Sequence, residues 1–76
     1  MTLEEQINQI LGDFESNSSE DIIKILNQIM PYFKSKLTSE YLQSKIQKIL
    51  KIDNENEKKK QCKSLTPYLY WYLQGL

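Results

Sequence analysis

Histidine is absent from the 76-residue sequence, and Cys62 is its single cysteine. One cysteine cannot form an intramolecular disulfide, and this chain cannot supply four His and Cys side chains to a structural zinc site. General acid–base catalysis most often uses a histidine, or else a carboxylate pair in a desolvated cleft. The acidic residues stand at expected helix starts or in a polar stretch, where capping and solubility explain them. The sequence therefore predicts no catalytic residue, no metal site and no cofactor, and hence a protein that is not an enzyme.

Cys62 is the one candidate nucleophile in the chain. The neighbouring Lys59, Lys60 and Lys63 would favour its thiolate, which is the reactive form. A thiol nucleophile also needs a base, and no histidine is present to serve as one. Because a lone cysteine beside a helix is more often a small apolar residue of the core, we expect Cys62 to pack rather than to react.

Glycine-rich loops and long apolar segments are also missing. The only glycines are Gly12 and Gly75, so the sequence contains no glycine-rich phosphate-binding loop. No apolar run approaches the roughly 20 residues that cross a membrane as a helix. The first residues, Met-Thr-Leu-Glu-Glu, do not have the pattern of a signal peptide. Together with the lone thiol, these features predict a cytoplasmic protein.

Arginine is absent, so all ten cationic side chains are lysines. Lysine lacks the rigid fork with which arginine holds phosphate or guanine, which makes nucleic acid an unfavoured partner. The formal net charge is zero, but residues 1–30 contain six acidic residues and one lysine, and residues 31–76 contain nine lysines and four acidic residues. The two parts therefore carry net charges of −5 and +5. This asymmetry predicts that charge steers a partner into place or arranges a head-to-tail dimer.

Apolar residues recur at helical spacing in three segments, and this pattern predicts an all-α fold. The three stripes comprise Leu3, Ile7, Ile10, Leu11 and Phe14, then Ile22, Leu26, Ile29, Phe33 and Leu37, and last Leu42, Ile46, Ile49 and Leu50. The first helix is expected at about residues 3–15, with Thr2 and Glu5 as a capping box. The third is expected at about 39–52, with Thr38 as its N-cap.

The second helix is expected at about residues 19–37, starting after Ser18. Its apolar stripe keeps its phase through Pro31, and a loop at that point would have no reason to preserve the phase. The pattern therefore predicts one helix kinked at Pro31, or two abutting helices of which Pro31 opens the second. Tyr32 lies off the stripe, on the flank of this segment.

The rest of the chain combines a polar stretch with an aromatic one. Residues 53–64 are polar almost throughout, which predicts a linker or a solvated helical turn. Thr66 and Pro67 then favour a new helix start, and a fourth helix is expected at about 67–75. The whole chain, residues 1–76, is thus predicted to form one domain, a small up-and-down bundle of three to four helices in which a short aromatic C-terminal helix closes the core.

The expected C-terminal helix is apolar on nearly every side. One face collects Leu65, Leu69, Tyr72, Leu73 and Leu76. Trp71 and Tyr70 point in two other directions, and Tyr68 lies between that face and Trp71. Because large amphipathic aromatic residues are enriched at interfaces, we expect a partner-binding surface centred on Trp71 and Tyr70, with Tyr68 and Tyr32 as weaker candidates. For Trp71 itself, the pattern is equally compatible with the core and with an interface.

These observations predict a small, non-catalytic interaction or regulatory protein that binds a protein partner and can also self-associate. One alternative is weak binding of single-stranded nucleic acid, with cations on the phosphates and aromatic rings under the bases. Its basic patch would comprise Lys58, Lys59, Lys60 and Lys63. Zero net charge, the lack of arginine and the acidic first part of the chain favour a protein partner. The simplest interpretation of the patch is a solvated run of charge before a packed helix.

A second alternative is peripheral contact with a membrane. The same lysines and the aromatic helix would lie on an anionic surface, but four lysines contribute only about 4 kcal/mol and the apolar helix is short. The general build, small antiparallel helices with an aromatic end, resembles that of the bacteriocin-immunity proteins. This resemblance rests on build and on no motif, and it implies an immunity-type role as a further alternative.

Overall fold

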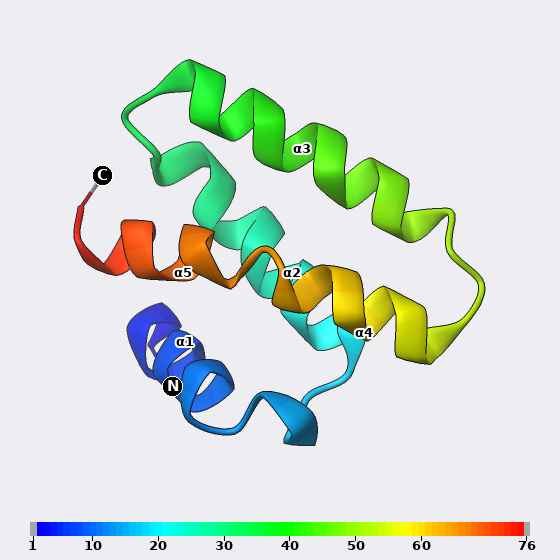
Figure 1. Cartoon of the computed structure of the whole chain (residues 1–76). Coiled ribbons are helices and arrows are strands. Elements are labelled where there is room, and N and C mark those ends of the chain that lie inside the picture. The colour runs from blue at the N-terminus through cyan, green and yellow to red at the C-terminus, as the bar shows by residue number, and fades with distance from the viewer. Residues whose placement is uncertain (1, 76) are drawn as a thin grey trace.

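The computed structural model describes residues 2–75, and over this range it is all-α (Figure 1). It contains five α-helices and two short 3-10 turns. In chain order these are α1 (Leu3–Gly12), η1 (Phe14–Ser16), α2 (Ser19–Ile29), η2 (Met30–Tyr32), α3 (Lys36–Leu50), α4 (Glu55–Lys63) and α5 (Thr66–Leu73). The prediction of a small all-α helical bundle with a short aromatic C-terminal helix is confirmed.

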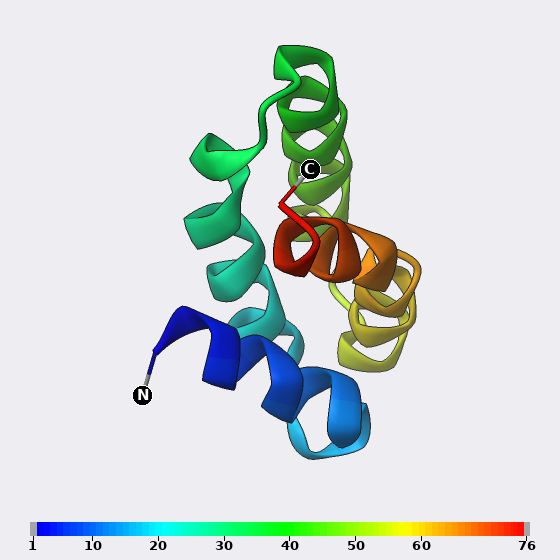
Figure 2. The same ribbon diagram turned by 90° about the vertical axis from the view of Figure 1, so that its left-hand side faces the viewer.

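The arrangement of the helices places α2 at the centre of the packing. It contacts α1, α3, α4 and α5. Figure 1 shows α4 and α5 following one another nearly in line, and we refer to residues 55–73 as the α4–α5 rod. Both views show α3 running beside this rod, while α1 lies at the opposite end of the molecule from the start of α3 (Figure 2). The five α-helices therefore occupy four positions in the bundle.

The core lies where these helices meet, and each α-helix contributes to it. The largest fully buried side chains are Ile7 of α1, Ile22, Leu26 and Ile29 of α2, Leu42 of α3, Cys62 of α4 and Leu69 of α5. Because the apolar stripes of the first two helices and of α3 all reach this cluster, helical periodicity identified most of its members. Within residues 2–75, no helix has both the length and the apolar character that crossing a bilayer requires.

Side-chain caps mark the helix starts. The Thr2 hydroxyl accepts a hydrogen bond from the Glu5 amide at 3.2 Å, and the Ser18 hydroxyl accepts one from the Asp21 amide at 3.2 Å. The prediction for the third helix was wrong at its start, since α3 begins at Lys36 and Ser35, not Thr38, is its N-cap. Ser35 has the extended backbone of a cap and accepts from the amide three residues on.

The expected helix over residues 19–37 ends early. α2 stops at Ile29, and Pro31 lies in the 3-10 turn η2 rather than in a kinked helix. Proline has no amide proton, and its ring clashes with the carbonyl four residues earlier. The backbone therefore forms the tighter i to i+3 hydrogen bonds of a 3-10 turn instead of continuing the α-helix. Phe33 is then extended at φ −69° and ψ 136° and still reaches the core. Leu37, which the stripe placed in the core, is exposed in the first turn of α3.

The polar stretch predicted as a linker over residues 53–64 contains the nine-residue helix α4. Asn54 caps this helix by accepting a hydrogen bond from the Glu57 amide at 3.0 Å. The acidic Glu55 and Glu57 lie in its first turn, where the positive end of the helix dipole stabilises them. Its only buried residue is Cys62, so it cannot be recognised from an apolar stripe. The helix is kept in place largely by polar contacts to distant segments.

Smaller corrections concern the ends of the other helices. α1 ends at Gly12 rather than at residue 15, because Asp13 leaves helical geometry and η1 follows. α3 ends at Leu50, which is exposed although the stripe placed it in the core. α5 covers Thr66–Leu73 with Leu65 as its N-cap, so it ends before residue 75. Leu76, which the wheel assigned to the core face, lies outside the described residues.

Candidate functional site

The aromatic residues of α5 and of the α2–α3 connection gather in one cluster. The rings of Tyr68 and Trp71 meet edge to face with centroids 5.0 Å apart, and those of Phe33 and Tyr68 do so at 6.1 Å. Tyr32 and Tyr72 form a third edge-to-face pair at 6.0 Å. Such pairs contribute about 0.5–1.5 kcal/mol beyond the burial of area. The structure thus brings three of the four predicted interface residues, Trp71, Tyr68 and Tyr32, to one region.

Tyr68 and Tyr70 differ in position from what the wheel suggested. Tyr68 is buried, and this burial raises the pKa of its hydroxyl, with a smaller contribution from Tyr41. It therefore supports Trp71 from beneath rather than presenting a surface of its own. Tyr70 is exposed and makes no ring contact within the part of the chain that the structure describes. Trp71 combines both situations, since it packs on Tyr68 and keeps 40% of its surface exposed.

A groove of about 430 Å³ opens beside Trp71, and we call it the aromatic groove. Its walls come from three elements: the α2–α3 connection, the first turn of α3 and the end of α5. The lining residues are Phe33, Lys34, Ser35, Thr38, Trp71 and Gly75. Of these, only Trp71 was predicted as a site residue. The others are separated from it by more than thirty residues of sequence or lie in a loop, so no periodicity could have associated them.

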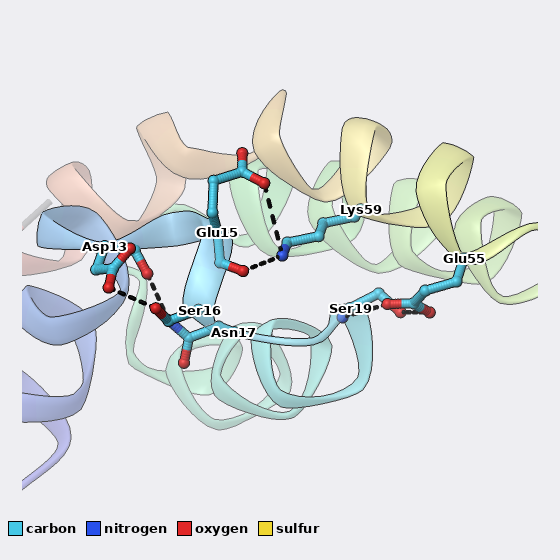
Figure 3. A network of polar contacts seen from close by, with 7 residues as sticks. All are labelled: Asp13, Glu15, Ser16, Asn17, Ser19, Glu55 and Lys59. Atoms are coloured by element: carbon cyan, nitrogen blue, oxygen red, sulfur yellow. Dashed lines mark hydrogen bonds and ion pairs between the residues drawn. The ribbon is translucent and has the colours of Figure 1, made fainter.

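The predicted basic patch is divided by its contacts. The Lys59 ammonium donates to the Glu15 carbonyl oxygen at 2.5 Å and lies 3.8 Å from the Glu15 carboxylate (Figure 3). It also lies 5.9 Å from the Phe14 ring centroid. It therefore serves to hold η1 against α4. Lys60 and Lys63 line a shallow pocket of about 250 Å³ with Lys59, but none of the α5 aromatic residues lines it. Lys58 is half-buried and does not line this pocket.

Glu55 joins α4 to the start of α2. One carboxylate oxygen accepts from the Ser19 hydroxyl at 2.7 Å and the other accepts from the Ser19 amide at 3.0 Å (Figure 3). These two bonds, the hydroxyl first, hold the pKa of Glu55 below its ordinary value, against a smaller opposing effect of burial. The positive N-terminal end of the α2 dipole also stabilises a carboxylate at this position. The contact has a structural role, because both carboxylate oxygens accept hydrogen bonds from Ser19, one from its hydroxyl and one from its amide.

Cys62 lies directly inside this junction. Its side chain is fully buried, with the sulfur 4.0 Å from the Ser19 carbonyl oxygen. Burial raises the pKa of the thiol to about 11, and the Glu55 charge adds to the effect. At neutral pH the group is therefore a thiol, which is a poor nucleophile and a suitable small core residue.

Among residues 2–75, no three His, Cys, Asp or Glu side chains are grouped so that they could hold a metal ion.

Comparison of the sequence and the fold with protein-family models, curated proteins and solved structures finds no match. The geometry of the aromatic groove is therefore the basis for a functional proposal.

Proposed function

We propose that this chain is a small, non-catalytic cytoplasmic protein that binds a partner protein through the aromatic groove. The observation that carries the proposal is the concentration of exposed apolar surface around this groove. Trp71 lines it, and three other exposed residues, Tyr32, Leu37 and Tyr70, are each next in sequence to one of its lining residues, Phe33, Thr38 and Trp71. Exposed apolar surface of this extent on a small chain is typical of an interaction site.

Trp71 has the properties of an interface anchor. It is held from below by Tyr68, so little side-chain entropy remains to be lost when a partner covers it. Its exposed part borders an open groove, where a partner side chain can bury apolar area against both Trp71 and Phe33. The hydroxyls of Ser35 and Thr38 offer polar contacts at the rim of the same groove. A regulatory role through competition for such a partner is consistent with the small size of the chain.

Binding of single-stranded nucleic acid remains the alternative proposal, but the geometry supports it less. One of the four lysines of the patch, Lys59, is engaged with Glu15, and the rings that would stack on bases lie along α5 rather than between the lysines. The immunity-type role is one form that binding a partner protein would take.

The proposal is tested by affinity capture from a lysate of the source cells, with and without nuclease treatment, using three variants. Trp71→Ala removes the anchor and Thr38→Arg fills the groove, so both should lose the captured partner. Leu50→Ala is the matched control, because Leu50 is an exposed apolar residue at the other end of α3. Thermal melts establish that each variant is folded.

Equal capture by all three variants would show that the aromatic groove is not the binding site. Capture that disappears on nuclease treatment, and that depends on Lys58, Lys60 and Lys63 rather than on Trp71, would replace the proposal with the nucleic-acid alternative.

A further inference from the structure

A second groove lies in the seam between α3 and the α4–α5 rod, on the flank of α3 that also carries Thr38 of the aromatic groove. The second one, which we call the lysine groove, has a volume of about 240 Å³. Lys45, Lys48, Ile49 and Ile52 line it on one side, and Gln61, Ser64 and Leu65 line it on the other. Figure 1 shows α3 and the rod side by side along this seam, diverging toward the end of α5.

The α3 wall is continuous from one groove to the other. Thr38 of the aromatic groove and Lys45 of the lysine groove are seven residues apart, and side chains seven apart lie on one face of a helix. Tyr41 lies between them on that face and is 58% exposed. It is also close enough to the buried Tyr68 of α5 to influence the pKa of Tyr68. This flank of α3 thus joins an aromatic groove to a groove lined by Lys45 and Lys48.

The charges along the seam have one sign. Lys34, Lys45 and Lys48 are the charged residues among those that line the two grooves, and no Asp or Glu of the described chain lines either one. A surface that is apolar in its groove and positive along its length favours a partner that carries an apolar anchor and carboxylates. The same charge opposes a basic partner.

The length and shape of the seam favour a helix as the partner segment. From Thr38 to Lys48, ten residues of α3 at 1.5 Å each span about 15 Å, which three turns of a partner helix would match. The seam offers side-chain walls and no sheet edge, so an extended strand would find no backbone partners there, whereas a helix satisfies its own backbone bonds. Helices also pack into such seams at axis separations of about 8–10 Å.

A second copy of this chain does not fit the seam. Its acidic surface lies in residues 1–30, but within the described range, residues 2–75, the large apolar side chains that are exposed all come after residue 31. The acidic half therefore has no exposed anchor for the aromatic groove. An acidic segment of another protein can supply both features together.

We infer that the partner segment is an acidic amphipathic helix of another protein, which lies along the seam with an apolar side chain in the aromatic groove and carboxylates facing Lys45 and Lys48. This inference rests on the proposed function, because it assigns the chemistry of the partner that the groove binds. It also fixes the direction in which the partner helix lies, because the apolar anchor and the carboxylates of that helix must be about two turns apart.

The test uses a displayed library of random 16-residue peptides, selected on the wild-type chain. Enriched peptides are then titrated against the protein by the fluorescence of Trp71, which is its only tryptophan. We expect net negative peptides with apolar residues at i, i+3 or i+4 and i+7, which gain helical circular dichroism on binding. The double variant Lys45→Glu with Lys48→Glu should weaken them at least tenfold.

The matched control is Lys24→Glu with Lys60→Glu, two exposed lysines that line neither groove, and it should change the affinity less than threefold. Enrichment of neutral or basic peptides that still need Trp71 would overturn the inference while leaving the proposed function intact. Failure to enrich any peptide that needs Trp71 would overturn the inference as well. Concentration-dependent dimerisation that Thr38→Arg abolishes would instead identify a second copy as the occupant.

Discussion

Residues 2–31 bury or half-bury every large apolar side chain that they contain, whereas residues 32–75 leave six exposed. The six are Tyr32, Leu37, Tyr41, Leu50, Tyr70 and Trp71. The two parts also differ in charge, net −5 before residue 31 and +5 after it. The comparison indicates that the acidic part completes its own packing, and that the basic part keeps apolar surface that packing within this chain does not cover.

Helix α4 is the junction between the two parts. Glu55 bonds to Ser19 at the start of α2, Lys59 bonds to Glu15 in η1, and Cys62 fills the space next to Ser19. The junction therefore combines two polar contacts at its edge with one buried thiol. Substitutions in the core, at this junction and at the helix ends test how far the two parts depend on one another.

The largest expected effect is that of Leu69→Ala. Leu69 is fully buried, so the change should lower the free energy of unfolding by about 2–5 kcal/mol. Trp71→Ala removes a side chain that keeps 40% of its surface exposed, so it loses the edge-to-face contact and only part of a full burial, and it should cost less than Leu69→Ala. Urea denaturation of the two variants measures the difference. Equal losses would show that Trp71 belongs to the core. Packing within the chain would then cover the apolar surface of the basic part as fully as that of the acidic part.

The second prediction concerns the reactivity of Cys62. Its pKa of about 11 lies two units above the ordinary value of 9.0, so the thiolate fraction at pH 8 is about 100-fold lower than in an unfolded chain. Burial should slow labelling by a thiol reagent further. The rate is measured at pH 8 with and without denaturant. Labelling of the native protein at the rate of a free thiol would mean that α4 does not stay on α2.

The third prediction is a pH dependence caused by Glu55. Its pKa is lower in the folded protein than in the unfolded chain, so its contacts stabilise the fold above pH 4.5 and this contribution disappears as pH falls through the folded pKa. Glu55→Gln should lower stability at pH 7 by less than Leu69→Ala does, and the difference from wild type should shrink at low pH. The positive charges of Lys58 and Lys59 also lower the pKa of this carboxylate, by less than the Ser19 hydrogen bonds do.

Urea titrations from pH 2 to pH 7 measure this dependence. Glu20→Gln is the matched control, because Glu20 is an exposed acidic residue in the first turn of α2 that accepts no bond from Ser19. A difference between wild type and Glu55→Gln that stays constant with pH would contradict the role assigned to the carboxylate.

The smallest expected effects are those at the two glycines, one in each part. Gly12 ends α1 with open space around its Cα, so Gly12→Ala should stabilise the protein by about 0.5–1 kcal/mol. Gly75 follows α5 at φ +80°, where an L side chain is strained, so Gly75→Ala should destabilise it by about 1 kcal/mol. Thermal melts measure the sign of the change in melting temperature for each variant. Two changes of the same sign would contradict the backbone conformation assigned to one of the two glycines.

Several features of the fold could be predicted from local sequence. The spacing of Ile7 and Ile10 in α1, and of Ile22, Leu26 and Ile29 in α2, is enough to identify the two buried faces, because one side of a helix repeats every three or four residues. The caps at Thr2 and Ser18 follow from hydroxyls that precede acidic first turns. Of the residues that line the aromatic groove, the pattern identified only Trp71.

The remaining features depend on contacts between distant residues. α4 has almost no apolar stripe, and its first residue and its middle are held by bonds from Glu55 to Ser19 and from Lys59 to Glu15, residues 36 and 44 positions apart. The aromatic groove likewise joins Phe33 and Thr38 to Trp71 across the bundle. By itself, the sequence determined an all-α chain with its main buried faces and two oppositely charged parts, because helical periodicity and net charge are local or additive properties. Only the tertiary structure decided that residues 55–63 are helical and that the aromatic groove and the lysine groove lie beside the same helix, α3, because these depend on which distant segments the folded chain brings together.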